Sequence, residues 1–422
     1  MPLSEMKRSG IALPAPSPPQ SSLFLGKETS MTITGIIAEY NPFHRGHAYH
    51  LSRAREITGA DFVIVAMSGN YVQRGVPAMF DKYTRAEAAL RGGADLVLEL
   101  PLCAACGSAE YFSDGAVDLF MQTDIVTDLC FGSECGSLSP LEEAASLLAE
   151  EPEDYRTRLR QHLREGDSFP AARARALQAE LPSTPPGILD SPNNLLGIEY
   201  LKALKKRNCR IRPHTVSREG SGYHDLTMGR KHFASAGAIR RELVRQNGLF
   251  TEAIREQLPD FEVYRAYEGK TPLSEDSFSL LLLQKLRSIQ GESLDTFFDV
   301  PEELSNRIWN RLDEFTSFSD FAELLKSRNL TRTAVNRALL HILLDIRQYR
   351  RADHLRVLGL QKEAKVLLNL LSTHGRLPLL TGLSGSGLPE HTFYPDRLYE
   401  SVRSLVHGIP YQNEHRRKML IV

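Results

Sequence analysis

Two histidines near residue 45 have the types and spacing needed to hold an anion. They lie at the end of the segment over residues 35–47, in the sequence His44-Arg45-Gly46-His47. A short apolar run over residues 33–38 predicts a buried strand, Asn41-Pro42 interrupts it, and a helical pattern follows over residues 47–54. The histidines would then lie beside unpaired helical N–H groups at the positive end of a helix dipole, which favour an anion such as phosphate. Because Gly46 has no side chain, a nucleotide could approach the backbone closely at this position.

Two other interpretations of this histidine pair stay open from the residues alone. The side chains could simply be exposed, or they could be two ligands of a metal ion. A zinc site needs a third ligand, and the neighbouring sequence offers only His50. The strand, turn and helix around the pair favour the phosphate interpretation.

The cysteines raise a second metal or redox hypothesis. The chain has five: Cys103, Cys106, Cys130, Cys135 and Cys209. An odd number in a large chain with no secretory pattern indicates reduced thiols and a cytoplasmic location. Cys103 and Cys106 have C-x-x-C spacing, but the second pair is loosely spaced, so small buried cysteines are the favoured interpretation.

Composition excludes some classes of protein. The 422 residues carry a net charge of −1 and 24% charged residues, so bulk basicity cannot drive nucleic-acid binding, and any RNA contact must come from local patches. No run of eighteen apolar residues occurs, which predicts the absence of a membrane span. Residues 1–30 are rich in proline and serine and predict a disordered extension that lacks the pattern of a signal peptide.

Strand and helix patterns alternate after residue 31. Strands are predicted over residues 33–38, 61–67, 94–100 and 125–131, with helices over 82–90 and 109–121. Such alternation is typical of parallel βαβ units, in which ligands bind beyond the carboxyl ends of the strands. We therefore expect the histidine segment, Ser68-Gly69-Asn70 and Phe131-Gly132-Ser133-Glu134 to share one edge of the sheet.

The middle of the chain predicts more helices and one returning strand. Helices are expected over residues 141–150, 155–165, 170–180 and 195–206, and a strand over 209–216. Asn193 and Asn194 precede the last helix, and they either cap it or return to a nucleotide together with Arg218. Residues 233–243 begin another helix with small residues and place Arg240 one turn in, where serine, backbone N–H groups and a guanidinium could hold phosphate.

Several motifs together carry a resemblance to a known family. They are Glu39-Tyr40-Asn41-Pro42-Phe43-His44-x-Gly46-His47, Met67-Ser68-Gly69-Asn70 with Gln73-Arg74-Gly75, Phe131-Gly132-Ser133-Glu134, Pro192-Asn193-Asn194-x-Leu196-Gly197, and Tyr223-His224-Asp225. From Thr32 to the helix containing Arg240 the chain resembles the bacterial tRNA(Met) cytidine acetate ligases of the nucleotidyltransferase superfamily. The N-terminal extension has no counterpart in the family pattern.

The resemblance implies a fold and an activity. It implies an α/β, Rossmann-like nucleotidyltransferase domain with a parallel sheet over residues 31–248, followed by a mostly α-helical domain over residues 249–422 that could bind tRNA. It also implies that ATP activates acetate to acetyl-adenylate, with release of pyrophosphate. The acetyl group then passes to the wobble cytidine of elongator tRNA(Met) and gives N4-acetylcytidine.

The resemblance also implies which residues form the site. His44, His47 and Arg240 would be catalytic, because carboxylate attack on the α-phosphate needs positioned donors and cations. The residues that would contact ATP are Ile37, Ala38, Glu39, Tyr40, Asn41, Pro42, Phe43, His44, Arg45, Gly46, His47, Ala48, Tyr49 and His50, with Gly132, Asn193 and Arg218. Magnesium is expected with the triphosphate, although no carboxylate cluster in the sequence indicates its ligands.

The region after residue 249 predicts helices over residues 273–289, 331–346 and 361–371. Basic clusters could contact tRNA or form solvated faces. They comprise Lys205, Lys206, Arg207, Arg210 and Arg212; Arg347, Arg350, Arg351 and Arg356; and Arg416, Arg417 and Lys418. Two other functions stay open: adenylyl transfer to a small metabolite, or nucleotide-dependent RNA binding without catalysis. The sequence does not indicate the oligomeric state.

Overall fold

The computed structural model describes residues 31–185, 187–189, 191–218 and 233–422. The extension predicted over residues 1–30 and the Tyr223-His224-Asp225 motif lie outside these ranges. Thr32–Val422 forms one compact unit. The division of this unit into two domains at residue 248 stays a prediction.

The centre of this unit is a mainly parallel sheet with strand order β10-β8-β5-β2-β1-β6-β7. Five neighbouring strands are parallel: β1 (Ile33–Ala38), β2 (Phe62–Ser68), β5 (Leu96–Leu100), β6 (Asp128–Ser133) and β7 (Arg212–Ser217). All five were predicted, with shifts of a few residues at their ends. The chain order reverses between β1 and β6, so the ligand-binding crevice of a sheet of this kind is expected there.

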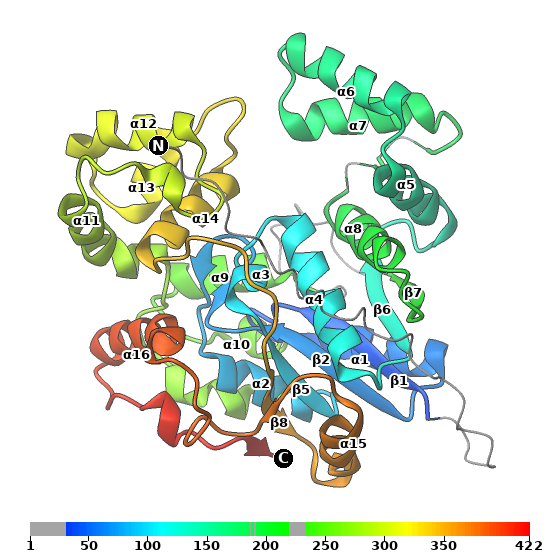
Figure 1. Ribbon diagram of the computed structural model, residues 1–422. Coiled ribbons are helices and arrows are strands. Elements are labelled where there is room, and N and C mark those ends of the chain that lie inside the picture. The colour runs from blue at the N-terminus through cyan, green and yellow to red at the C-terminus, as the bar shows by residue number, and fades with distance from the viewer. Residues whose placement is uncertain (1–30, 186, 190, 219–232) are drawn as a thin grey trace, which may run out of the picture. The chain divides into compact units, whose positions relative to one another are not determined.

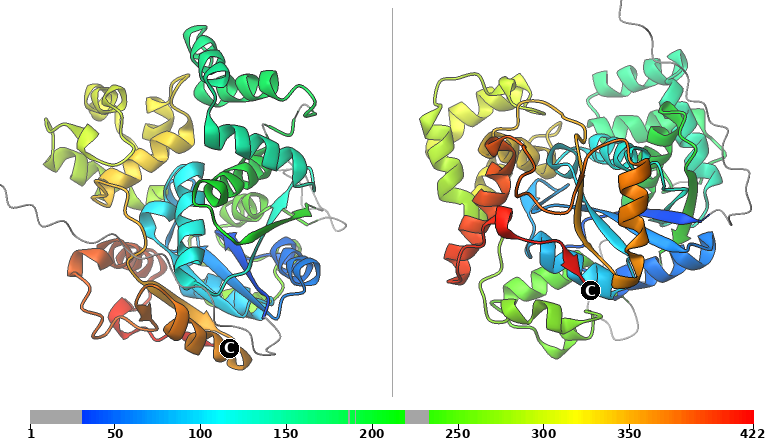
Figure 2. Two further views of the ribbon diagram at one scale, coloured as in Figure 1. Left: turned by 45° about the vertical axis from the view of Figure 1, so that its right-hand side comes forward. Right: turned by 60° about the horizontal axis from the view of Figure 1, so that its bottom comes forward.

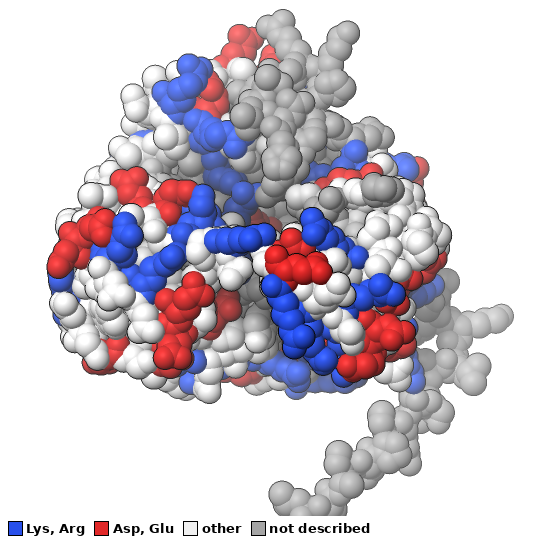
Figure 3. Space-filling model, turned by 90° about the horizontal axis from the view of Figure 1, so that it is seen from above, with Lys and Arg blue, Asp and Glu red and all other residues white. Residues whose placement is uncertain are grey.

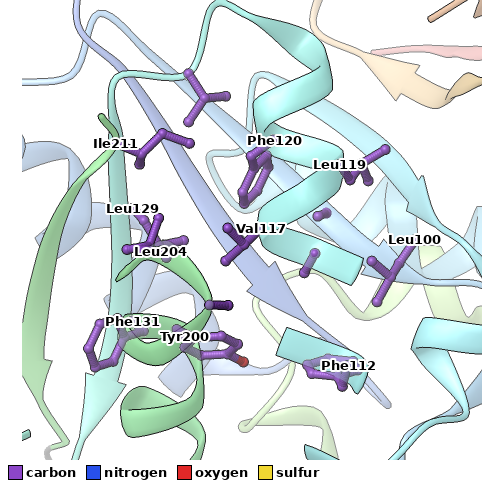
Figure 4. Packing of buried hydrophobic residues seen from close by; sticks show 14 of the residues in the cluster. Leu100, Phe112, Val117, Leu119, Phe120, Leu129, Phe131, Tyr200, Leu204 and Ile211 are labelled. Carbon is purple, nitrogen blue, oxygen red and sulfur yellow. The ribbon is translucent and has the colours of Figure 1, made fainter. Parts of the chain in front are cut away.

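Helices cover both faces of the sheet. On one face lie α4 (Ala109–Thr123) and α8 (Pro192–Lys206). Figure 4 shows Val117 of α4 pointing toward Leu129 of β6 within this packed layer. A Cβ at Gly35 in the middle of β1 would lie 2.7 Å from the Phe120 ring, so this glycine lets α4 pack directly on the strand. The other face is covered by α1 (Arg45–Thr58), α2 (Lys82–Arg91) and α9 (Ala236–Arg245).

Two groups of helices extend from this core. The first contains α5 (Ser139–Glu150), α6 (Glu153–Arg164) and α7 (Phe169–Glu180), which follow one another beyond α8 (Figures 1 and 2). The second has its own apolar cluster. Its helices are α11 (Ser279–Ser288), α12 (Glu302–Arg311), α13 (Phe318–Leu325), α14 (Arg332–Leu343) and α16 (Tyr394–His407). Two short helices are α3 (Leu102–Ala105) and α10 (Glu252–Arg255). Helix α15 (Val366–His374) packs against the sheet in the same apolar cluster as α4 and α8.

The C-terminal region is mostly helical, as predicted, but it also supplies strands that the sequence analysis did not predict. Strand β8 (Leu355–Leu360) pairs antiparallel with β5, and β10 (Leu420–Ile421) and β9 (Leu379–Leu380) pair parallel with β8. All six residues of β8 are buried. A short apolar run without alternation gives no period from which a strand can be identified, which explains the omission.

A buried ionic cluster joins the C-terminal region to the sheet. The Lys82 side chain is fully buried, and its Nζ lies 2.8 Å from Glu99, 2.7 Å from Asp396 and 2.8 Å from Glu414. Arg356 supplies a second cation, 3.2 Å from Glu99. Burial outweighs these cations at Asp396 and raises the pKa of its carboxyl to about 6. Buried ion pairs of this kind add little to the free energy of unfolding. The cluster instead connects α2, β5 and β8 to the C-terminal segment.

Candidate nucleotide-binding site

The turn between β1 and α1 is held in place by a buried arginine. Arg85 of α2 is 0% exposed, and it donates hydrogen bonds to the carbonyl oxygens of Glu39 (2.6 Å) and Ser68 (3.0 Å) and, through Nε, of Phe80 (2.9 Å). Glu39 directly follows β1, and Ser68 is the last residue of the neighbouring strand β2. A single guanidinium therefore ties the carboxyl ends of β1 and β2 together. The sequence analysis did not identify Arg85, since one arginine in a helical pattern usually faces solvent.

Three further contacts fix the rest of the turn. The Asn41 side-chain oxygen accepts a hydrogen bond from the Met79 N–H (2.9 Å), and its carbonyl accepts one from Arg240 (2.5 Å). The Phe43 N–H donates to the Tyr264 hydroxyl (3.1 Å). Because these partners come from widely separated segments, the histidines after the turn are presented in one defined position.

His44 and His47 interact directly at the start of α1. His44 is the N-cap of the helix: its Nδ1 accepts from the Gly46 N–H (3.0 Å), while its own N–H donates to Nδ1 of His47 (3.3 Å). The two rings stack with centroids 3.8 Å apart. Since both Nδ1 atoms accept hydrogen bonds, the neutral tautomer assigned to each ring carries its proton on Nε2. The pair therefore offers two N–H donors, one from each of the stacked rings.

The backbone N–H groups of α1 do not have the role expected from the sequence. Arg45 N–H donates to the Gln257 carbonyl (2.8 Å), and the N–H groups of His47 and Ala48 donate to the His44 carbonyl (2.8 and 3.2 Å). With Gly46 N–H on the His44 ring, the first turn is satisfied. The expectation of unpaired helical N–H groups for the anion is wrong, because His44 and the Gln257 carbonyl accept their hydrogen bonds.

Gly46 is required for this arrangement. A Cβ at this position would lie 2.9 Å from Cε1 of the His44 ring. Any side chain would therefore displace the ring that caps the helix. The structure adds a steric reason for the glycine to the one expected from nucleotide approach.

The local electrostatics keep the histidines neutral. Burial first, and then the Arg218 and Arg240 guanidinium groups, lower the pKa of His44 to about 3. Burial and then the neighbouring His44 and Arg218 hold the pKa of His47 well below 6.5, and burial with Arg218 lowers the pKa of His50 to about 4. The imidazoles are consequently uncharged at neutral pH until an anion enters.

The second half of the site lies at the ends of β6 and β7. The Arg218 N–H donates to the Ser133 carbonyl (3.0 Å), and its guanidinium donates to the Asn193 side-chain oxygen (2.9 Å). A Cβ at Gly132 would lie 3.4 Å from Cγ of Arg218. Gly132, Asn193 and Arg218 are thus brought together as predicted. Arg218 is also close enough to His44 to lower its pKa, so both halves meet where the chain order of the sheet reverses.

Glu134 organises this half of the site. Its carboxylate accepts hydrogen bonds from the Asn193 N–H (3.2 Å), the Asn193 side-chain amide (2.6 Å) and the Asn194 N–H (2.8 Å), so it caps α8. Asn194 uses its side-chain oxygen to accept from the N–H groups of Glu134 and Cys135. The interpretation of the asparagines as the caps of α8 is wrong. Their cap comes from a carboxylate some 60 residues earlier, which only the fold brings near.

Neither a metal cluster nor a disulfide is present in the described part of the chain. Within it, no three His, Cys, Asp or Glu side chains are grouped as metal ligands, and all five cysteines are free thiols. Cys106 and Cys130 are buried, and burial raises the pKa of both thiols. The helices within the described ranges are also too short or too polar to cross a membrane.

Comparison with known proteins agrees with this geometry. The HIGH nucleotidyl transferase family matches residues 31–414. The tRNA(Met) cytidine acetate ligase of Thermoanaerobacter sp. strain X514 is 40% identical over 364 residues, which cover 84% of this chain and 89% of that relative. The chain belongs to the tRNA(Met) cytidine acetate ligase family. The ligase of Halothermothrix orenii is 36% identical over 417 residues, covering 93% and 99% of the two chains.

Solved structures of a family member show the same fold. Apo TmcAL of Thermotoga maritima has a TM-score of 0.83 and 31% identity, and the match covers 93% of this chain and 100% of that one. TmcAL bound with alpha-thio ATP has a TM-score of 0.80 and 29% identity over 93% and 99%. The mainly parallel sheet and the helical C-terminal region therefore match the fold of this ligase family.

The neutrality of His44 predicts a pH-dependent stability. In the unfolded chain its pKa is near 6.5, so below that pH the unfolded state binds one proton more than the folded state, and stability falls as the pH falls. Between pH 8 and 5.5 the free energy of unfolding should fall by about 1 kcal/mol less in His44→Asn, which keeps a capping oxygen but cannot protonate. Urea denaturation at both pH values measures this difference.

The exposed His391 provides the control for this measurement. His391→Asn should lose as much stability on acidification as the unsubstituted protein, because this exposed side chain has similar surroundings in the folded and the unfolded chain. If His44→Asn and the unsubstituted protein respond equally to pH, His44 protonates freely in the folded state and the account of its burial is wrong.

Proposed function

We propose that this protein uses ATP to convert acetate to acetyl-adenylate and then acetylates N4 of the wobble cytidine of elongator tRNA(Met). The observation that carries the proposal is the stacked, neutral pair of the buried His44 and the half-buried His47, with Arg218 and Arg240 near His44, in a chain 40% identical to a ligase of that name. The proposed location is the cytoplasm, because the proposed acceptor is a tRNA.

In the first step an acetate oxygen attacks the α-phosphorus of ATP. The new bond from oxygen to phosphorus forms as the bond to pyrophosphate breaks, and negative charge is spread over the phosphoryl oxygens and the leaving group. We propose that the Nε2–H groups of His44 and His47 donate to these oxygens and that Arg218 and Arg240 balance their charge. Preorganised donors in a site with little water stabilise such a charge most effectively.

The arginines are positioned by partners that an ATP molecule need not displace. Asn193 holds one amino group of Arg218, and the Asn41 carbonyl holds one of Arg240. A guanidinium has five N–H donors, so each can retain this contact and still meet a phosphate oxygen. We propose that residues 37–50, Gly132, Asn193 and Arg218 contact the nucleotide and that His44, His47 and Arg240 act in catalysis.

Magnesium is proposed as a companion of the triphosphate. The described residues contain no group of three carboxylate or histidine side chains that would hold the ion by themselves. Mg²⁺ commonly keeps several waters and binds phosphate oxygens directly, so an ion that arrives with ATP does not need three protein ligands. When bound, it would neutralise part of the triphosphate charge.

In the second step the cytidine amine attacks the carbonyl carbon of acetyl-adenylate. The bond from nitrogen to carbon forms, AMP leaves, and the amine loses a proton. The exposed side chains of Arg350 and Arg351 are proposed tRNA contacts. Figure 3 shows basic side chains around a hollow near the middle of one face, with acidic side chains interspersed over its lower half. Local cations of this kind can bind RNA despite a net charge near zero.

Several cations suggested by the sequence have structural partners instead. Arg356 is buried in the ionic cluster with Lys82, so its proposed role in RNA contact is wrong. Arg207 pairs with Asp114 (2.7 Å) and Asp118 (2.8 Å). Charge density along the sequence overestimates the cations that are available to RNA, because it does not show which of them the fold neutralises.

Acetate-dependent exchange of pyrophosphate into ATP tests the proposed first step. The purified protein should catalyse this exchange only when acetate is present, because acetyl-adenylate formation is reversible. Adding tRNA(Met) should then yield N4-acetylcytidine, detected by mass spectrometry of the nucleosides. Exchange without acetate, or the absence of acetylated cytidine with tRNA present, would favour adenylyl transfer to a small metabolite.

Replacing His47 tests the role of the histidine pair. His47→Ala removes one Nε2–H donor, and the exchange rate should fall by a factor of about 10² to 10³, the usual effect of losing one oxyanion donor. Circular dichroism should show an unchanged fold, and the exposed His391→Ala variant should retain full exchange. Activity retained in His47→Ala would remove this imidazole from the mechanism.

A further inference from the structure

A second cavity lies in the C-terminal region, with a volume of about 390 Å³. We call it the C-terminal cavity. It is lined by Leu379, Leu380, Thr381, Gly382, Leu383, Ser384, Gly385, Ser386, His415, Arg416, Arg417 and Lys418. Figure 2 (right) shows the segment after β8, in orange, beside the red C-terminal segment that leads to β10. The lining contains no Asp or Glu.

We propose that the C-terminal cavity binds a phosphate group and that, in the complex with tRNA, this phosphate belongs to the RNA backbone. The choice of RNA as its source rests on the proposed function. None of the lining residues belongs to the segments around His44, Asn193, Arg218 or Arg240. The cavity is therefore separate from the nucleotide-binding site.

Two uncompensated cations line the cavity. The side chains of Arg416 and Lys418 are exposed, and neither forms an ion pair with a residue in the described ranges. Arg417 between them is already paired with Asp81 (3.1 Å). A guanidinium and an ammonium beside one cavity with no carboxylate favour a phosphate ligand.

The backbone that carries these cations is held firmly. Glu414 precedes them and is buried, 2.8 Å from the Lys82 ammonium and 3.0 Å from the Tyr83 hydroxyl. Arg417 packs over the Tyr83 ring, 4.4 Å from its centroid, and β10 follows in the sheet. Arg416 and Lys418 are thus next to residues that are held in place, Arg417 between them and Glu414 before them. Little backbone entropy remains to be lost when they meet a ligand, unlike cations on a free chain end.

The opposite wall is built to supply neutral donors. It follows β9 and contains Gly382, Ser384, Gly385 and Ser386, with the buried Leu383 (2% exposed) fixing its base. Gly385 has φ +75°, and a Cβ at Gly382 or Gly385 would meet no atom within 4 Å. The Ser386 N–H is paired with the Leu383 carbonyl (3.1 Å), so the neutral donors of this wall are its serine hydroxyls, beside glycines that leave room for an anion.

The size and remaining lining of the cavity fit a nucleotide unit. About 390 Å³ exceeds the space that a phosphate alone needs and lies within the range of small-ligand pockets. The half-buried Leu379 and Leu380 offer apolar surface beside the cations. A backbone phosphate with its attached sugar would meet both kinds of surface.

Charge reversal in the C-terminal cavity tests the proposal. The variant Arg416→Glu/Lys418→Glu should bind a tRNA(Met) transcript at least about tenfold more weakly at 0.1 M salt, by fluorescence anisotropy. Losing this phosphate contact should also reduce the slope of log K against log salt by about 0.7 to 0.9. The control Lys362→Glu/Lys365→Glu makes the same change in net charge at exposed positions outside the cavity, and its affinity should change less than about threefold.

Two further measurements identify the source of the phosphate and separate this site from the proposed function. Isothermal titration with inorganic phosphate compares the unsubstituted protein with the cavity variant; loss of phosphate binding with unchanged tRNA affinity would support a phosphate site filled by a small compound and reject the RNA source. If neither tRNA nor phosphate binding changes, the proposal is overturned.

Acetate-dependent pyrophosphate exchange needs no tRNA and should be equal in all three proteins. If exchange is absent from all of them while tRNA binding still depends on Arg416 and Lys418, the proposed function fails and the phosphate site stands. If exchange is normal while tRNA and phosphate binding are unchanged in the cavity variant, the phosphate site fails and the proposed function stands.

Discussion

Removal of water from two stacked imidazoles is the interaction on which the nucleotide site depends. His44 is 5% exposed and lies against His47, and both accept a backbone N–H at Nδ1. The pair gives up the charge that histidines often use to bind phosphate and gains two fixed N–H donors. A bound triphosphate would raise both pKa values again, and an Nε2–H can donate whether the ring is neutral or charged. The donors are therefore in place before and after charge develops.

The site also depends on segments beyond the region that resembles a nucleotidyltransferase domain. Gln257 accepts hydrogen bonds from the N–H groups of Arg45 and Ala234, and Tyr264 bonds to the backbone of Phe43. Gln257 and Tyr264 follow residue 248 in the chain and still support the segment that carries the histidines. The proposed adenylate chemistry and the C-terminal region consequently belong to one structural unit, and the buried cluster around Lys82 extends this unit to the last strand.

The sequence predicts those parts of the molecule that are set by local pattern. The parallel strands and the helix after His44-Arg45-Gly46-His47 follow from apolar runs and turns. The resemblance to the ligase family implied that Gly132, Asn193 and Arg218 belong to one site, and the structure brings them together. Long-range partnership is not predictable in this way. Glu134 looks like an ordinary acidic residue after a strand, although it caps a helix that begins at Pro192.

Burial is the other property that local pattern does not reveal. Arg85 and Arg356 occupy helical and strand positions that could equally face solvent, but the fold encloses both. Strand β8 is fully buried, so it lacks the alternation that identifies a strand with one solvated face. For the same reason the basic clusters could not be divided by sequence into structural and exposed cations.

The state of the two imidazoles can be observed directly by NMR of protein labelled with ¹⁵N in histidine. Two-bond nitrogen–proton correlation spectra report which ring nitrogen carries the proton and at what pH the ring becomes charged. The structure predicts that His44 and His47 keep the Nε2–H tautomer in the nucleotide-free protein, that His44 remains neutral from pH 8 to pH 5, and that His47 becomes charged only well below pH 6.5. Protonation midpoints near 6.5, or a proton on Nδ1 of either ring, would contradict the account.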